Sequence, residues 1–514
     1  MPEEKECVLT VDVGTTSIKS AVVDIKTYEI LSKASTKAVI NYPKKGWAEK
    51  EPEKLWNSVI EVSREAIEDL GLEEVKAIIF GAHMAGVLPI DKEGEPLRDI
   101  IIWLDERAAG LPEDIWKGFI KVQGYSIFKL LKFLRITGGA PSKTGKDAIS
   151  KIIWIRENEP DVFGKAKKIL DVKGFLINRA TDETVTSPDE AHLTWLADTR
   201  KGGVEWSSSL LKDYNLSAEM FPEIRQSTDI AGELKAEVAE ELGLRRSVPV
   251  VVGAGDVCAS AVGSGAVMPD ELHIYIGTSN WVAGHITKRK TDVFHFIGSL
   301  MSAIPERYLL IAEQEVAAGA LEWAMRLVGI EGRYREVEEM AEKAEVGRLI
   351  FMPWLYGERA PIDDPYVRGG LINISLDHGR GEVLRSMMEG VALNIKWIYT
   401  HMEKMTKQQK EVSIVGGGTL FNIWCQIVAD AIKRPVKRIK NPEQSGVRGL
   451  ATISSVALRR DSFESAVQKF QVDRVFKPDP DSTLIYDRLF RVYKELYSKL
   501  KKIYRELNAT DTHS

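Results

Sequence analysis

The chain has 514 residues, which is too many for one hydrophobic core, since single cores stop growing near about 250–300 residues. Its 75 acidic and 70 basic residues nearly cancel, giving a formal net charge of −5, so we expect no nucleic-acid partner. No stretch approaches the roughly 20 apolar residues of a membrane span, and we expect no membrane partner either.

The three cysteines, Cys7, Cys258 and Cys425, lie far apart and form no CxxC pair. This spacing disfavours a disulfide framework and a thiolate zinc site. The first residues, MPEEKECVLT, are acidic and polar, which is not typical of a signal peptide. These features together favour a cytoplasmic protein.

Two segments with the same pattern predict β-hairpins. Residues 7–24 form two β-rich runs around the first glycine turn, Gly14-Thr15-Thr16-Ser17. Residues 271–286 repeat this form around the second glycine turn, Gly277-Thr278-Ser279. The turns stand about half the chain apart, which favours a distant duplication, with coincidence as the alternative.

Strands and helices alternate through the rest of the chain. We expect strands at residues 76–81, 99–103, 247–252 and 411–418, and helices at residues 147–159, 257–267, 382–401, 421–432 and 486–507. Pro160 closes the first of these helices, and the last one is amphipathic and basic. This alternation predicts α/β layers, with two halves that meet near Gly253 and share a cleft.

The common nucleotide and metal motifs are incomplete, since the sequence has no full GxxxxGK[ST], GxGxxG or HExxH pattern. A glycine turn can still cradle phosphate, because its backbone N–H groups converge on the anion. Asp12 stands just before the first glycine turn and is a candidate magnesium ligand, acting through water. Lys19 follows that turn and is a candidate phosphate contact. The alternative is that both turns are ordinary hairpins.

Asp256 follows a predicted strand and the turn Gly253-Ala254-Gly255. A carboxylate at a strand end beside flexible backbone is well placed to act as a general base. The alternative is that Asp256 caps the following helix.

Several motifs occur together in the order that they have in a known family. They are Asp12-x-Gly-Thr-Thr-Ser, Trp103-x-Asp105-x-Arg107, Gly-x-Gly-Asp256, Gly277-Thr-Ser, the run from Pro353 to Pro361, Arg368-Gly369-Gly370, Glu389-Gly390, and Gly416-Gly417-Gly418 with Trp424, Gln426 and Asp430. Over about residues 8–460 the chain thus resembles the FGGY carbohydrate kinases.

This resemblance implies an α/β fold of two actin-like ATPase (ribonuclease-H-like) domains that flank a catalytic cleft. Residues 1–254 would form the sugar-binding N-terminal domain, and residues 255–514 the nucleotide-binding C-terminal domain, which ends in the amphipathic helix. The implied activity is transfer of the γ-phosphate of ATP to a sugar or polyol hydroxyl with Mg²⁺. A homodimer is a further expectation.

The resemblance also implies a role for each matched residue. Asp256 becomes the general base, and Asp12 the carboxylate on the magnesium side. The expected nucleotide contacts are Gly14, Thr15, Thr16, Ser17, Lys19, Gly277, Thr278, Gly417, Gly418 and Asn422. Asn422 lies near the family's adenine contact, and the alternative is that it is a helix residue facing solvent.

The acceptor site is expected at residues 81–91, where glycerol kinases carry an Arg-Glu pair and xylulokinases carry Met-His. This chain has Met84-Ala85, so it is nearest the xylulokinase-like branch. His83 is a candidate replacement for the missing histidine, and the alternative is a buried structural residue. Val257 also departs from the xylulokinase pattern, which commonly has Asn there.

Two further residues are expected at the acceptor site: Trp103 as a face for the sugar, unless it is a core aromatic, and Asp105 as a hydroxyl acceptor that Arg107 orients. The best single acceptor is a ketopentose such as D-xylulose. The alternatives are another polyol, a linear diketone-triol, or a non-catalytic ATPase switch.

Overall fold

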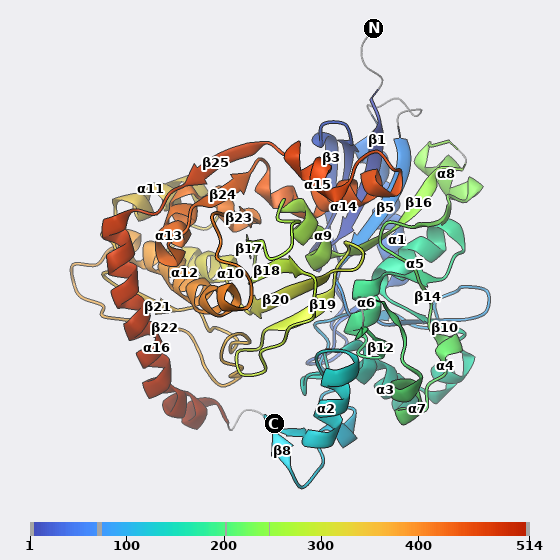
Figure 1. Cartoon of the computed structure of the whole chain (residues 1–514), viewed down its shortest axis with the longest axis horizontal. Coiled ribbons are helices and arrows are strands. Elements are labelled where there is room, and N and C mark those ends of the chain that lie inside the picture. Colours follow the sequence, from blue (N-terminus) through green and yellow to red (C-terminus); the bar gives the residue numbers. More distant parts are fainter. Residues whose placement is uncertain (1–4, 69–74, 201–202, 246, 510–514) are drawn as a thin grey trace.

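The computed structural model of the chain describes residues 5–68, 75–200, 203–245 and 247–509. Figure 1 shows two α/β halves side by side, with the N-terminal half in blue to green and the C-terminal half in yellow to red. Each half is built on one large sheet. The predicted two-domain α/β fold is therefore confirmed.

The first sheet has the strand order β15-β16-β5-β1-β2-β3. Its strands are β1 (Cys7–Val13), β2 (Ser17–Asp24), β3 (Glu29–Lys37), β5 (Val75–Ala82), β15 (Ile230–Glu233) and β16 (Pro249–Gly255). The central strands β1, β5 and β16 are parallel, and the other three pairs, β15–β16, β1–β2 and β2–β3, are antiparallel. Their near-continuous apolar sequences are typical of strands that helices cover on both faces.

The second sheet has the order β19-β20-β18-β17-β23-β24-β25. Its strands are β17 (Leu272–Ile276), β18 (Asn280–Ile286), β19 (Gly298–Met301), β20 (Tyr308–Gln314), β23 (Val412–Val415), β24 (Val436–Ile439) and β25 (Val472–Phe476). From β20 to β25 the sequence of parallel and antiparallel pairings repeats that from β3 to β15 in the first sheet. This repeated topology supports the predicted duplication.

Two helices fill the space between the sheets. Helix α9 (Asp256–Gly263) follows β16 directly, and α14 (Ser445–Ala457) packs across it and against β1 and β5. Side chains of both helices share one hydrophobic cluster with residues of both sheets, among them Val8 and Trp281. The two halves therefore meet in a common core.

The remaining helices pack around the two sheets. In the first half they are α1 (Pro52–Ile67), α2 (Ile127–Ile136), α3 (Ala148–Asn158), α4 (Pro160–Lys165), α5 (Val172–Thr181), α6 (Pro188–Leu193), α7 (Ser208–Asp213) and α8 (Ala236–Leu242); in the second they are α10 (Ala318–Leu327), α11 (Tyr334–Lys343), α12 (Arg380–Met405), α13 (Asn422–Ile432), α15 (Phe463–Gln468) and α16 (Pro480–Asn508). None of the helices in the described ranges combines the length and apolar character that a membrane crossing needs.

Several predicted boundaries shift. The strand expected at residues 99–103 shrinks to β7 (Ile100–Ile101), which pairs with the two-residue β4 (Glu49–Lys50). Pro160 ends the helix before it, as predicted, but also begins α4, because proline fits the first helical turn, where its missing N–H is not needed. Helix α9 begins at Asp256 itself and ends at Gly263.

Candidate functional site

The carboxyl ends of the three parallel strands of the first sheet lie together. Asp12 on β1 pairs with Gly81 on β5, and Ala82 on β5 pairs with Gly255 on β16. Asp12, the segment from His83 onward and Asp256 therefore come to one sheet edge. Ligands of open α/β sheets bind outside this edge.

Two carboxylates at this edge have raised pKa values. Burial first, and then the nearby charge of Asp12, raise the pKa of Asp256 to about 8. Burial also raises the pKa of Asp12, against the lowering effect of Lys19. Within the described ranges Asp12 Oδ1 is buried and has no hydrogen-bond partner. Two neighbouring carboxylates and an unpartnered oxygen suit Mg²⁺, which takes one or two carboxylates and keeps several waters.

The raised pKa of Asp256 makes stability depend on pH. Between its ordinary value of 3.8 and about 8, the unfolded chain loses this proton before the folded chain does, so ionisation destabilises the fold increasingly over that window. We expect Asp256→Asn, which cannot ionise, to unfold at a higher temperature than the wild type at pH 8.5 in EDTA. The gain should shrink toward pH 4. Thermal melts across this range check it, and a gain independent of pH would contradict it.

The first glycine turn is held in place by side chains from outside it. The N–H of Gly14 donates to the carbonyl of Ser17 at 2.9 Å, which closes the turn. The indole N–H of Trp103 donates to Thr15 Oγ1 at 2.8 Å. Lys50 Nζ donates to the carbonyl of Gly14 at 2.9 Å, while Thr16 is exposed. Trp103, expected as a sugar contact, is thus also a support for this turn.

Lys19 links the first hairpin to the second half of the chain. It lies opposite Asp12 in the register of the hairpin. Its Nζ donates to the carbonyl of Glu443 at 3.4 Å, in the turn that precedes α14. Lys19 thus stands between the acidic edge of the first sheet and the C-terminal half.

The second glycine turn lies near the same carboxylates. The N–H of Gly277 donates to the carbonyl of Ser279 at 2.8 Å, and Thr278 is exposed. A Cβ at Gly277 would lie 2.5 Å from the ring of Tyr275, so glycine is required there. Burial and then the charges of Asp256 and Asp12 raise the pKa of Tyr275, which places this turn near them.

The glycines after β23 differ in the space that surrounds them. A Cβ at Gly418 would lie 2.5 Å from Ile276 Cγ2, so internal packing alone explains that glycine. Gly417 is exposed, and a Cβ there would meet no atom within 4 Å. Gly417 is therefore free to approach a ligand.

Asn422 is the first residue of α13 and is half-buried. Its N–H donates to Glu338 Oε1 at 2.6 Å, and its Oδ1 accepts from an Arg438 guanidinium nitrogen at 2.9 Å. An adenine contact at Asn422 stays a prediction.

The expected acceptor segment lies against the turn that carries Asp256. A Cβ at Gly255 would lie 2.6 Å from Met84 Sδ, so Met84 packs directly on the residue before Asp256. His83 is buried, and within the described ranges neither of its ring nitrogens has a hydrogen-bond partner. Ala85 has a left-handed backbone with φ of 59°.

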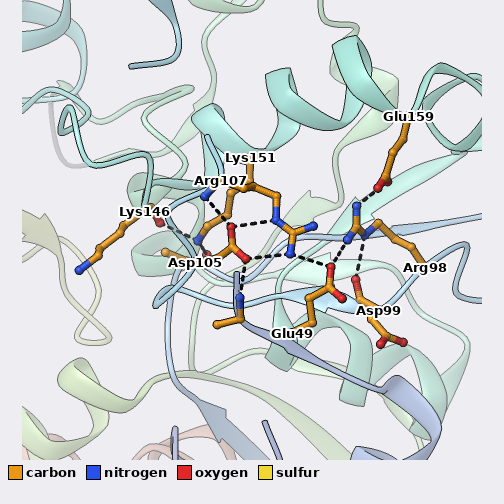
Figure 2. Close-up of polar contacts among 10 residues, drawn as sticks. Glu49, Arg98, Asp99, Asp105, Arg107, Lys146, Lys151 and Glu159 are labelled. Atoms are coloured by element: carbon orange, nitrogen blue, oxygen red, sulfur yellow. Dashed lines mark hydrogen bonds and ion pairs between the residues drawn. The ribbon is translucent and has the colours of Figure 1, made fainter. Parts of the chain in front are cut away.

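Asp105 is fully buried. Figure 2 shows its polar contacts with the residues around it. One oxygen accepts from the N–H of Ala48 at 2.6 Å, and both accept from the Arg107 guanidinium at 2.8–2.9 Å. Arg107 also pairs with Glu49 at 2.7 Å and lies 3.7 Å from the centre of the Trp47 ring. Arg107 thus orients Asp105, as predicted, but these bonds favour a role in holding the loop beside Trp103. Contact of Asp105 with substrate stays a prediction.

Sequence reasoning missed two buried lysines beside the acceptor segment. Burial lowers the pKa of Lys50 to about 8 and that of Lys151 to about 7. Lys151 Nζ donates to the carbonyl of Ala85 at 2.8 Å. Burial and then both lysines lower the pKa of His83. The one available signal was the position of Lys151 within the isoleucine-rich stretch 149–155.

The structure also adds Asp189, on α6, to the site. Its Oδ2 accepts from the N–H of Gly255 at 2.7 Å, which fixes the turn before Asp256. Nothing in the local sequence indicated this long-range contact.

The repeated sheets form two actin-like domains, and the glycine turns and neighbouring carboxylates between them suit a phosphotransferase that uses ATP. The N-terminal domain of the FGGY family of carbohydrate kinases matches residues 7–263, and the family's C-terminal domain matches residues 272–458. The chain belongs to the FGGY family of carbohydrate kinases. It is accordingly an ATP-dependent sugar kinase that uses Mg²⁺.

Individual relatives match nearly the whole length of the chain. A xylulose kinase of Staphylococcus epidermidis is 25% identical over 98% of this chain and 99% of its own length. A glycerol kinase of Thermococcus kodakarensis is 28% identical over 95% of this chain and 96% of its own length. The crystal structure of ligand-bound xylulose kinase from Lactobacillus acidophilus superposes with a TM-score of 0.87 at 24% identity, over 98% of this chain and all of that one, and shows the shared fold.

Proposed function

We propose that the chain transfers the γ-phosphoryl group of ATP to a hydroxyl of a five-carbon ketose, with D-xylulose as the best single acceptor. The packing of Met84 on the residue before Asp256 carries this proposal, because it puts the segment that distinguishes acceptors next to the base. The chain lacks the Arg-Glu pair at this position, which argues against glycerol. The xylulose kinase relatives support the same choice.

In this proposal Asp256 removes the proton of the attacking hydroxyl. A general base works best when its pKa lies near the working pH, and the pKa of Asp256 is raised to about 8. Its Oδ1 accepts from the N–H of Val257 at 2.9 Å, so Oδ2 would take the proton. Met84 and His83 would position the sugar beside it, with Trp103 on its apolar side.

Asp12 would hold Mg²⁺ through water. When bound, the ion offsets the negative charge of the phosphates. The two glycine turns, Lys19 and the exposed Gly417 would cradle ATP, with Asn422 near adenine. Residues 1–254 would thus supply the sugar-binding domain and residues 255–514 the nucleotide-binding domain.

The proposal places the enzyme in the cytoplasm, where ATP is supplied. The three buried thiols suit that reducing compartment. It also includes a homodimer, which light scattering on the purified chain tests.

Gly417→Val tests the nucleotide site with little risk to the fold, because a Cβ there meets no protein atom within 4 Å. We expect ATP affinity to fall at least tenfold, or about 1.4 kcal/mol, with an unchanged melting temperature. Gly418→Val is the contrasting variant, since it should lower the melting temperature by clashing with Ile276. Calorimetric titration that finds normal ATP affinity in Gly417→Val would remove this glycine from the site.

A panel of acceptors tests the substrate. We expect kcat/KM to be highest for a ketopentose and much lower for glycerol, because a site built for several hydroxyls leaves polar groups unpaired around a shorter ligand. The panel holds xylulose, ribulose, glycerol and a linear diketone-triol, each assayed by ATP consumption. His83→Ala should reduce turnover of the preferred sugar and spare ATP binding, because the ring has unpartnered nitrogens within the described ranges. Glycerol as the best acceptor would overturn the proposal.

A further inference from the structure

We propose that Asp292, His295 and His401 form a binding site for a divalent cation of the zinc class. We name these three residues the histidine cluster. One ligand atom from each of them lies within 4.8 Å of the other two. All three side chains are half-buried, which leaves a path for an ion. The kinase reaction described above uses none of them.

The histidine cluster is held together before any ion binds. The imidazole rings of His295 and His401 stack with their centres 3.6 Å apart and an interplanar angle of 27°. His295 Nδ1 lies 2.7 Å from Asp292 Oδ2. The N–H groups of Phe294 and His295 donate to Asp292 Oδ1 at 3.0 and 3.2 Å, which fixes this carboxylate.

Charged groups also stand near the cluster. Lys404 and Lys494 add local positive charge beside His401, and Asp292 supplies the one negative charge of the cluster.

A ligand set of two imidazoles and one carboxylate favours transition-metal cations over Mg²⁺. Imidazole suits Zn²⁺, Co²⁺ and Ni²⁺, whereas Mg²⁺ prefers oxygen ligands only. Zinc bonds of about 2.0–2.1 Å put the ligand atoms of a tetrahedron about 3.3 Å apart. Zinc would draw together ligand atoms that already lie within 4.8 Å of one another, and the two rings would have to leave their stacked arrangement; water would complete the fourth position.

The histidine cluster lies where a loop of the C-terminal half contacts the N-terminal half. Asp292 and His295 lie in the loop between β18 and β19, which follows the end of β18. The second glycine turn precedes the start of the same strand. At about 3.3 Å per residue, the strand separates the turn from the loop by about 20 Å. The start of this loop binds the N-terminal half: Arg289 donates to the carbonyl of Ile136 at 2.9 Å, and Thr291 Oγ1 to that of Gly138 at 2.8 Å.

His401 belongs to α12, in the C-terminal half. The loop residue Lys290 donates to the carbonyl of Met405 at the end of the same helix. A cation in the histidine cluster would therefore fasten to α12 a loop that also binds the N-terminal half. It would stabilise the junction between the two halves.

The test is a titration of untagged, chelator-treated full-length chain with Co²⁺ in excess Mg²⁺, followed by visible absorption. Four-coordinate Co²⁺ absorbs strongly, and we expect one equivalent to bind. His401→Ala and His295→Ala should each bind at least about tenfold more weakly. His378→Ala is the matched control, because His378 lies outside the cluster and accepts from the N–H of Ser375 at 3.0 Å.

Thermal melts with Zn²⁺ give a second readout. Zinc should raise the melting temperature of the wild type and of His378→Ala, but not that of His401→Ala. Circular dichroism establishes that each variant is folded. A wild type without strong Co²⁺ absorption, or His401→Ala with the affinity of the wild type, would overturn the proposal and show that the cluster is only a ring stack with an ion pair.

Discussion

Asp256→Asn is expected to lower kcat by about 10²–10⁴ while ATP affinity stays near that of the wild type. The amide has the shape of the carboxylate but cannot take a proton from the acceptor hydroxyl. It still offers an oxygen to the N–H of Val257, which Asp256 binds at 2.9 Å. Since Asn serves the start of a helix as well as Asp does, a loss of activity would not come from a lost cap.

Steady-state kinetics with the preferred sugar and calorimetry with ATP measure the two quantities. Asp479→Asn is the matched control, because Asp479 caps α16 by accepting from the N–H of Ser482 at 2.9 Å and lies outside the site. It should keep full activity. A normal kcat in Asp256→Asn would mean that Asp256 only begins α9.

Gly449→Ala is expected to destabilise the protein by about 3 kcal/mol. Helices α9 and α14 cross with their backbones in contact: a methyl group at position 449 would overlap the carbonyl oxygen of Ala259 and lie 2.6 Å from its carbonyl carbon. A Cβ at Gly263 would likewise overlap the carbonyl oxygen of Ser445. Neither backbone can yield without moving a sheet, because both helices lie in the core shared by the two halves.

Denaturant unfolding of Gly449→Ala and of Gly164→Ala measures this effect. Gly164 lies in α4, where a methyl group meets no atom within 4 Å, so the control should unfold like the wild type or be slightly more stable. Because α9 begins at Asp256, Gly449→Ala should lose activity along with stability. Equal stability of the two variants would show that the helices separate easily.

The features that the sequence predicts well are those encoded over short stretches. The β-rich runs around Gly14 and Gly277 identified both hairpins, and the apolar run before Gly253 identified β16 and the place of Asp256. Boundaries were less certain where context decides, as at Pro160, which ends one helix and begins the next.

The features that the sequence could not predict depend on contacts between distant segments. Lys50 and Lys151 are ordinary charged residues in the sequence, and only the fold buries them beside His83. Trp103 was expected to face the sugar, and its bond to Thr15 follows from the approach of two loops. The glycines at the crossing of α9 and α14 also have no local signature.

The most direct test of the account is detection of the product by mass spectrometry after the chain is incubated with xylulose, ATP and Mg²⁺. We expect a sugar heavier by one phosphoryl group, formed with the wild type and with Asp479→Asn, and nearly absent with Asp256→Asn or without Mg²⁺. A phosphorylated sugar formed at equal rates by the wild type and Asp256→Asn would contradict the assignment of this carboxylate as the base. Bound ATP without a phosphorylated product from any sugar or polyol of the panel would contradict the proposed reaction itself.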